Sequence, residues 1–115
     1  MHEYTYTFDQ IKESEDVNLL AFMRYDFAAR HGGVNRKIYF TADHGTICAA
    51  SPVAACEKLF TLYNLNRPAD YTGRSMSVSD IVNLWDNSTD TPVKTSWFCD
   101  SIGFVQIDGQ GQRIN

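Results

Sequence analysis

Polar side chains gather in residues 74–80, just before an apolar stretch with the composition of a buried strand. Arg74, Ser77 and Asp80 supply a guanidinium, a hydroxyl and a carboxylate there. In the structural interpretation, the serine and aspartate side chains bond nearby backbone groups and hold a turn where the strand begins. In the functional interpretation, these three residues meet Asp100 at one edge of a sheet and bind a partner or a small ligand. The one glycine before them is too little for a phosphate-binding loop.

The cysteines and histidines are the other candidates for chemistry. His44 and Cys48 are four residues apart, but no Cys-x-x-Cys or His-x-x-x-His pair supports a tetrahedral zinc site. Cys99 could act as a nucleophile with His31 or His44 as its base only if a nearby cation or helix N-terminus lowered its pKa, and its sequence neighbours supply neither. We therefore predict no metal, no cofactor and no catalytic residue, with Cys56 and Cys99 packed in the core. The odd number of irregularly spaced cysteines indicates reduced thiols.

The charge distribution limits the class of partner. The chain has fourteen acids and ten bases, a net charge of −4, and five of the acids lie in the first sixteen residues with a single base. Such a protein lacks the basic surface that holds a nucleic-acid backbone, so we expect no direct binding to duplex nucleic acid. Glu13, Glu15 and Asp16 could imitate phosphates in the basic groove of a nucleic-acid enzyme, or they could form an ordinary solvated surface. Stacking of single-stranded bases on exposed aromatic rings is a minor alternative.

The first third of the chain predicts a strand and then a helix. Residues 3–8 alternate aromatic and polar side chains, which is typical of a half-buried strand. Residues 17–23 are apolar without a clear period, and residues 24–31 favour helix. We expect a short strand that runs into a helix, with one longer helix from Asp16 as the alternative. Two glycines then end the helix.

The middle third predicts a hairpin and a second helix. Residues 37–48 are rich in branched and aromatic side chains, and residues 43–45 supply turn chemistry between two strands. Ser51 stands where a helix N-cap belongs and Pro52 at the first helical position, so a helix should run to about Tyr63. Its inner face is predicted to consist of Cys56, Leu59, Phe60 and Tyr63.

The last third predicts strands in antiparallel pairs. They are expected at residues 81–85, 95–99 and 102–107, with a polar loop at 86–92. A bulge or tight bend at residues 100–103 would let Phe104 and Ile107 face the core while Asp100 stays near the surface. Residues 108–115, rich in glycine and glutamine, are predicted to be a frayed tail.

These elements predict a single α+β domain over residues 1–107. Its architecture is an antiparallel sheet of about five strands with two helices packed on one face. The longest apolar runs fall far short of the roughly 20 residues that a membrane span needs, so we expect no membrane contact. The polar start of the chain is unlike a secretory signal, so we expect the protein to stay in the cytoplasm.

Two segments of this sequence resemble a known family. In residues 66–82 an Asn-Arg-Pro turn leads to the serine-rich run Ser-Met-Ser-Val-Ser-Asp, and residues 97–104 read Trp-Phe-Cys-Asp-Ser-Ile-Gly-Phe. The order and approximate spacing of these motifs resemble the YodL-like family of small bacterial domains. The resemblance is most specific from about residue 60 to residue 104. The chain departs from the pattern in a longer polar loop at residues 86–94, which could carry a protein-specific contact surface.

The resemblance implies a genetic setting and no enzymatic activity. Members of the family occur in mobile genetic elements of bacteria, and the motif residues have no assigned catalytic role. Small proteins in that setting often inhibit host defence by covering a nuclease or an effector. We therefore expect a non-enzymatic, protein-binding inhibitor of anti-CRISPR or anti-restriction type, whose partner is a host defence protein such as a CRISPR effector or a restriction nuclease.

The contact residues of such an inhibitor are expected among exposed acids and aromatics. The candidates are Glu13, Glu15, Asp16, Trp85, Asp86 and Asp90, beside the Arg74, Ser77, Asp80 and Asp100 set. The first alternative is an accessory module of a conjugative or phage DNA-processing complex. The second is a small-molecule enzyme, which would need Asp80, Asp100 and a histidine in one deep pocket.

Overall fold

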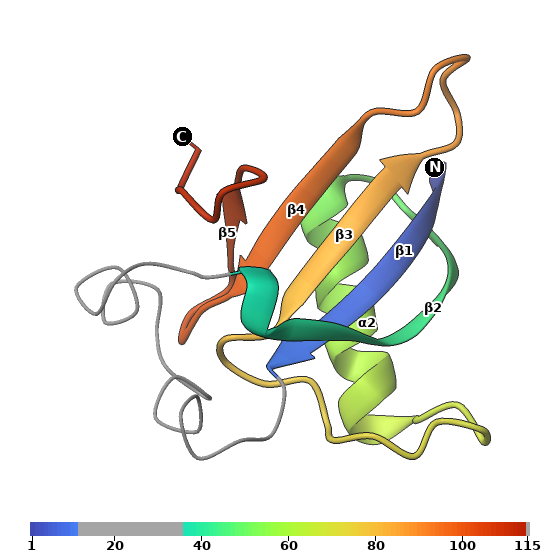
Figure 1. The fold of residues 1–115 in the computed structure, drawn as a ribbon. Coiled ribbons are helices and arrows are strands. Elements are labelled where there is room, and N and C mark those ends of the chain that lie inside the picture. The colour runs from blue at the N-terminus through green and yellow to red at the C-terminus, as the bar shows by residue number, and fades with distance from the viewer. Residues whose placement is uncertain (12–35, 115) are drawn as a thin grey trace.

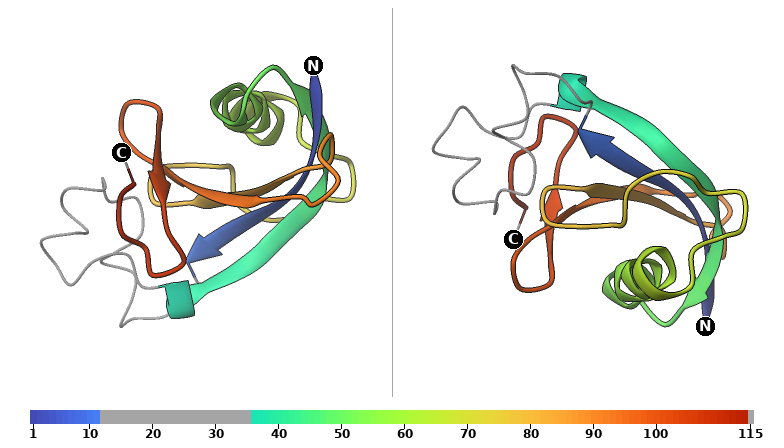
Figure 2. Two further views of the ribbon diagram at one scale, coloured as in Figure 1. Left: turned by 90° about the horizontal axis from the view of Figure 1, so that it is seen from above. Right: turned by 90° about the horizontal axis from the view of Figure 1, so that it is seen from below.

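The structure is a computed structural model that describes residues 1–11 and 36–114, and it contains one antiparallel sheet with one α-helix against it (Figure 1). The elements are β1 (His2–Ile11), η2 (Arg36–Ile38, a 3-10 helix), β2 (Tyr39–Ala49), α2 (Pro52–Leu65), β3 (Ile81–Asp86), β4 (Lys94–Cys99) and β5 (Phe104–Ile107). The strand order is β2-β1-β3-β4-β5, and the sheet curves around α2 (Figure 2). The predicted α+β architecture with five strands is confirmed.

The described residues contain a single α-helix, which is the second of the two that the sequence predicted. The strand predicted at 17–23 and the helix predicted at 24–31 lie outside those residues. Among the helices of the described ranges, none is long and apolar enough to cross a membrane.

β1 is an inner strand that pairs with β2 on one side and β3 on the other. Tyr4, Tyr6 and Phe8 point to the side of the sheet covered by α2 and are 3%, 5% and 0% exposed. Alternating aromatic residues stabilise this strand by burial of ring surface on one face. The predicted strand is confirmed, and it extends to Ile11.

β2 is one continuous edge strand where the sequence predicted a hairpin, so that prediction is wrong. β1 provides a partner from end to end, with Tyr6 opposite Gly45. A Cβ at Gly45 would lie 3.0 Å from the Tyr6 hydroxyl oxygen, so the glycine makes room for a ring and does not form a turn. A register shift between Phe8 and Asp9 adds one residue to β2 at Ala42, as in a β-bulge.

α2 begins as its sequence predicts. Ser51 is the N-cap, and its Oγ accepts a hydrogen bond from Ala54 N at 3.1 Å. Cys56, Leu59 and Tyr63 are fully buried against the sheet. Phe60 was predicted on the same face, but it is 40% exposed, because it borders a cavity between the helix and the connection from β4 to β5.

The last strand begins later than predicted, whereas β3 and β4 lie within one residue of their predicted bounds. β5 starts at Phe104, and Ile102, which was expected inside the strand, is 94% exposed on a tight turn in which Gly103 has a φ of +76°. Phe104 and Ile107 pack against core clusters on opposite sides of the sheet. Residues 108–114, predicted as a frayed tail, make a turn that returns to β5, with Ile114 N donating to Gln106 O at 2.8 Å.

The sheet is therefore buried on both sides near its middle. The larger core lies between α2 and the sheet and includes Phe8, Leu59, Tyr63, Val82 and Leu84. The smaller one lies on the other side and consists of Ile81, Phe98, Val105 and Ile107, with Tyr39 against it. β3 contributes to both, which explains its nearly continuous apolar sequence.

Candidate functional site

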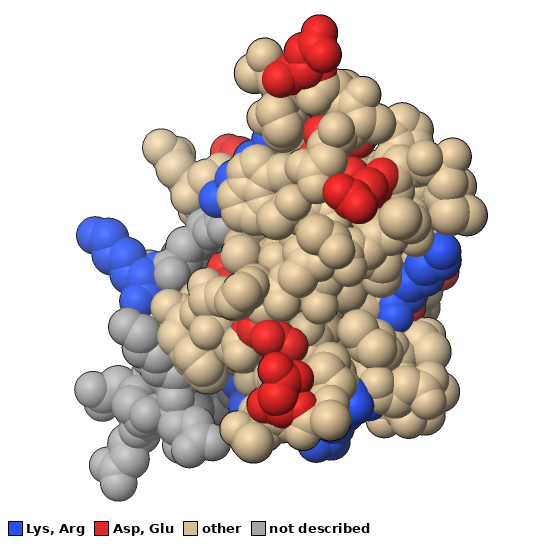
Figure 3. All heavy atoms as spheres, turned by 90° about the vertical axis from the view of Figure 1, so that its right-hand side faces the viewer, with Lys and Arg blue, Asp and Glu red and all other residues tan. Residues whose placement is uncertain are grey.

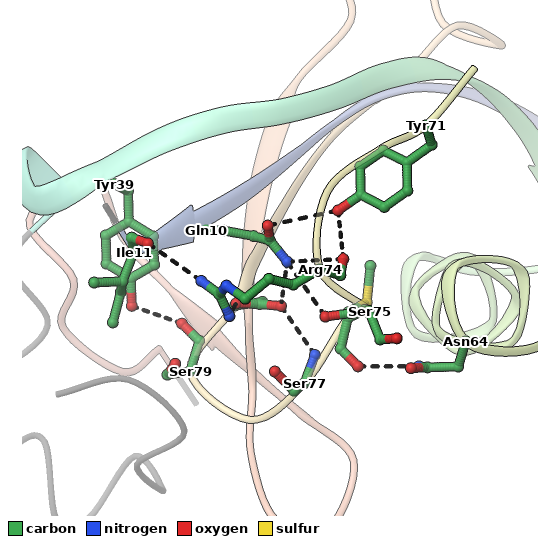
Figure 4. Close-up of polar contacts among 11 residues, drawn as sticks. Gln10, Ile11, Tyr39, Asn64, Tyr71, Arg74, Ser75, Ser77 and Ser79 are labelled. Carbon is green, nitrogen blue, oxygen red and sulfur yellow. Dashed lines mark hydrogen bonds and ion pairs between the residues drawn. The ribbon is translucent and has the colours of Figure 1, made fainter. Parts of the chain in front are cut away.

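A cluster of polar side chains forms where the chain enters β3 (Figure 4). This Asp80 cluster consists of Gln10, Arg74, Ser77 and Asp80. Asp80 is fully buried, and its Oδ2 accepts hydrogen bonds from Ser77 N at 2.9 Å and Gln10 Nε2 at 3.3 Å. Arg74 Nη1 lies 3.9 Å from Asp80 Oδ1. The structure thus brings together three residues that the sequence singled out.

The Asp80 cluster also holds the loop between α2 and β3 against the end of β1. Arg74 Nη2 donates to Ile11 O at 3.2 Å, and Gln10 Nε2 donates to Arg74 O at 3.2 Å and to Ser75 O at 3.3 Å. Tyr71 also donates its hydroxyl proton to Arg74 O. The loop has no regular secondary structure, so these bonds take the place of a strand ladder in satisfying its carbonyls.

Ser79 and Asp80 are joined to the end of β4 by their backbones. Ser79 N donates to Cys99 O at 2.9 Å, and Cys99 N donates to Asp80 O at 2.8 Å. Ser79 O accepts from the Tyr39 hydroxyl at 2.6 Å. Ser79 also has a φ of +86°, a left-handed conformation that costs free energy outside glycine and is held here by the three bonds. The serine-aspartate motif forms a tight structural entry to β3.

The electrostatics of Asp80 follow from its burial. Loss of water around the carboxyl raises its pKa to about 7, although the bonds from Ser77 and Gln10 and the charge of Arg74 act in the opposite direction. Asp80 lines neither of the two cavities described below. In this position the carboxyl can order the chain around it, but it does not meet a ligand from solvent.

Asp100 lies at a separate place, on the rim of a cavity of about 360 Å³. We call this cavity the Asp100 groove. Its walls are Glu57, Phe60 and Thr61 from α2 and Cys99, Asp100 and Phe104 from β4, β5 and their connection. Burial, with Asp80 and Asp100 nearby, raises the pKa of the Cys99 thiol to about 12, so Cys99 is not an activated nucleophile.

Trp85, Asp86 and Asp90 lie at the opposite end of the sheet, around the connection from β3 to β4. Trp85 is half-buried, with Lys94 Nζ 5.6 Å from its ring centroid. Asp86 Oδ2 is 3.0 Å from His2 Nδ1, and hydrogen bonds from Ser88, with the proximity of His2, hold the pKa of the Asp86 carboxyl below its ordinary value. Asp90 is exposed.

A second cavity, of about 320 Å³, lies at this end and is lined by His2, Tyr4, Pro52, Asp86, Val93 and Thr95, among others. Thr95 in this cavity and Cys99 in the Asp100 groove point to the same side of β4, because they are four residues apart in one strand. Both cavities are therefore lined by residues of α2 and of this side of β4, one toward each end of the strand.

Three of the predicted contact residues, Glu13, Glu15 and Asp16, lie outside the described residues. On the face shown in Figure 3, the described acidic and basic side chains occupy separate small spots in a largely uncharged surface. Among the described residues, no group of three or more histidine, cysteine, aspartate or glutamate side chains could hold a metal ion.

Sequence reasoning missed two residues of the Asp100 groove and its border. Phe60 was assigned to the inner face of α2 and Ile102 to a strand, yet both expose much of their side chains to solvent. The signal for Ile102 was the following Gly103, which permits the positive φ of a tight turn. No local signal distinguishes Phe60 from the buried residues of the helix, because its exposure depends on the cavity that α2 forms with the distant connection from β4 to β5.

Comparison with known proteins identifies a family for this fold. The family described as "YodL-like domain" matches residues 5–109, which is most of the chain. The chain therefore belongs to the YodL-like domain family. No curated protein and no solved structure gave a significant match.

Proposed function

We propose that this member of the YodL-like domain family acts by binding another protein, as an inhibitor of host defence of anti-CRISPR or anti-restriction type. One observation carries the proposal. Large apolar side chains are displayed to solvent around the Asp100 groove, where Phe60 is 40% and Ile102 is 94% exposed. Exposed apolar surface next to a cavity is typical of a protein interaction site.

Catalysis has less support from the same geometry. A small-molecule enzyme would place Asp80, Asp100 and a histidine in one pocket, but Asp80 is fully buried and lines neither cavity. None of the described histidines lines the Asp100 groove. Binding by shape and charge needs no activated group, so it fits a site whose thiol is held in its protonated form.

The partner class comes from the setting that the family resemblance implies. A compact domain of net charge −4 can cover the basic nucleic-acid channel of a nuclease or effector, because acidic surfaces complement such channels. Asp86, Asp90 and Asp100 are the described candidates for these contacts.

The test is co-purification of the tagged chain with a panel of purified CRISPR effectors and restriction nucleases, followed by nuclease assays at equal molar amounts. The proposal predicts a stoichiometric complex with one of them and loss of its cleavage activity. Complexes only with transfer or DNA-processing proteins of a mobile element would replace the inhibitor by an accessory module. Turnover of a small molecule without any protein complex would contradict both.

A further inference from the structure

The Asp100 groove has a chemical character that narrows the kind of side chain it can receive. Glu57 and Asp100 are the charged residues among the described ones that line it, and none of these described lining residues is a lysine, an arginine or a histidine. Two aromatic residues, Phe60 and Phe104, are also among its lining residues. A site with two carboxylates and two aromatic rings is suited to a cation that carries an apolar stem.

The two carboxylates come from different walls. Glu57 lies on α2, and Asp100 lies on the connection between β4 and β5. Asp100 N donates to Gly103 O at 2.9 Å, and Asp100 Oδ1 accepts from Ser101 N at 2.8 Å. These bonds close the turn and hold the Asp100 carboxylate at the rim, so the acid needs little reordering when a cation arrives.

The same turn presents Ile102. Gly103 has a φ of +76°, and nothing lies within 4 Å of the position that a Cβ would take there. Ile102 therefore projects into solvent beside the groove, where it adds apolar contact area for residues that flank an inserted side chain. The cavity volume of about 360 Å³ is at the lower end of the roughly 300–1,000 Å³ of typical ligand sites, which suits one inserted side chain.

We infer that the Asp100 groove receives an arginine side chain of the partner protein, with the guanidinium between Glu57 and Asp100 and the stem against Phe60 and Phe104. Arginine fits better than lysine because its planar guanidinium stacks on aromatic rings and binds carboxylates through two hydrogen bonds. This inference depends on the proposed protein-binding function and specifies the chemistry of its partner.

The experiment uses the full chain and a defined probe, the capped tripeptide Leu-Arg-Leu, with capped Leu-Gln-Leu and Leu-Glu-Leu as matched controls. Amide chemical shifts are followed by NMR at constant ionic strength. We expect saturable shifts at residues 57–61 and 99–104 with the arginine peptide, weaker shifts with the glutamine peptide and none with the glutamate peptide. Equal shifts with all three peptides, or no saturable shifts there with the arginine peptide, would overturn the inference.

Substitutions of the two carboxylates test where the guanidinium binds. Glu57→Gln and Asp100→Asn should each weaken binding of the arginine peptide by about two- to fivefold, the range of exposed ion pairs. Asp100→Asn keeps an oxygen that can accept from Ser101 N, so the turn survives. Asp70→Asn removes an exposed carboxylate that lines neither cavity and serves as the matched control, with unchanged binding expected. Unchanged binding in both groove variants would contradict the inference.

Failure of the arginine site can be distinguished from failure of the proposed function. If a nuclease or effector forms a stoichiometric complex equally well with wild type and with the Glu57→Gln, Asp100→Asn double variant, the arginine site is wrong and the inhibitor stands. If the arginine peptide binds as expected but no nuclease or effector does, the site stands and the proposed class of partner is wrong.

Discussion

The Asp80 cluster and the Asp100 groove use the same residue type in opposite ways, although the backbones of Asp80 and Cys99 are hydrogen-bonded to each other. Asp80 has no exposed surface, and the bonds of its carboxylate run to the backbone and side chains of the surrounding chain. Asp100 lies on the rim of a cavity, next to apolar side chains that are exposed to solvent. Within one motif, the buried acid orders the fold and the other acid lines a cavity.

The largest expected effect comes from removing the buried acid. Asp80→Ala leaves Ser77 N without its acceptor and opens a cavity, so the free energy of unfolding should fall by about 3 kcal/mol. Urea denaturation followed by circular dichroism measures it. Asp100→Ala is the paired control and should cost about 1 kcal/mol or less, because its carboxylate accepts a hydrogen bond from Ser101 N in an exposed turn. Equal costs would abolish the contrast between the two acids.

The pH dependence of stability sharpens the same contrast. The Asp80 carboxyl stays protonated in the folded state up to about pH 7, whereas in the unfolded chain it ionises near its ordinary value of 3.8. The folded state binds more protons in that interval, so the contribution of Asp80 to the free energy of unfolding falls as pH rises through it and is constant above it.

Asp80→Asn should remove this fall, which can be followed by urea denaturation at a series of pH values between 4 and 7. The lowered pKa of Asp86 acts in the opposite direction but only at more acidic pH, so the difference between wild type and variant isolates Asp80. A variant whose pH profile runs parallel to that of wild type would show that Asp80 is ionised in the folded state.

A smaller effect is expected at Ser77, the serine of the cluster. Its backbone N–H bonds Asp80, but its Oγ is buried without a hydrogen-bond partner among the described residues. Ser77→Ala should therefore change the free energy of unfolding by about 0.5 kcal/mol or less, of either sign. A decrease of about 2 kcal/mol or more in the free energy of unfolding, measured by urea denaturation, would mean that the hydroxyl has a role in ordering the cluster.

Local signals predicted the parts of the fold that depend on neighbouring residues. The Ser51-Pro52 pair fixed the start of α2, and the alternation of aromatic residues identified β1. β2 could not be predicted from such signals, because Gly45 is typical of a turn and only the Tyr6 ring on another strand explains it. A long partner strand overrides turn propensity when it offers a continuous ladder.

Only part of the candidate site could be predicted from the sequence. The serine-aspartate turn was among the interpretations of residues 74–80, since such side chains bond local backbone. The Asp100 groove was not, because it joins α2 to the connection between β4 and β5, which are distant in sequence. Helical periodicity placed Phe60 inward, and only the position of α2 over the sheet shows that its ring borders open space.

The central claim is that the chain binds a partner through the Asp100 groove and not through the Asp80 cluster. The most direct test compares the affinity of a purified effector for wild type, Ile102→Ser and Ser77→Ala by calorimetry, with thermal unfolding of each. Ile102→Ser should weaken binding by about tenfold or more without lowering the unfolding midpoint, because its side chain is 94% exposed, and Ser77→Ala should bind like wild type. Full affinity in Ile102→Ser together with weakened binding in Ser77→Ala would contradict the claim.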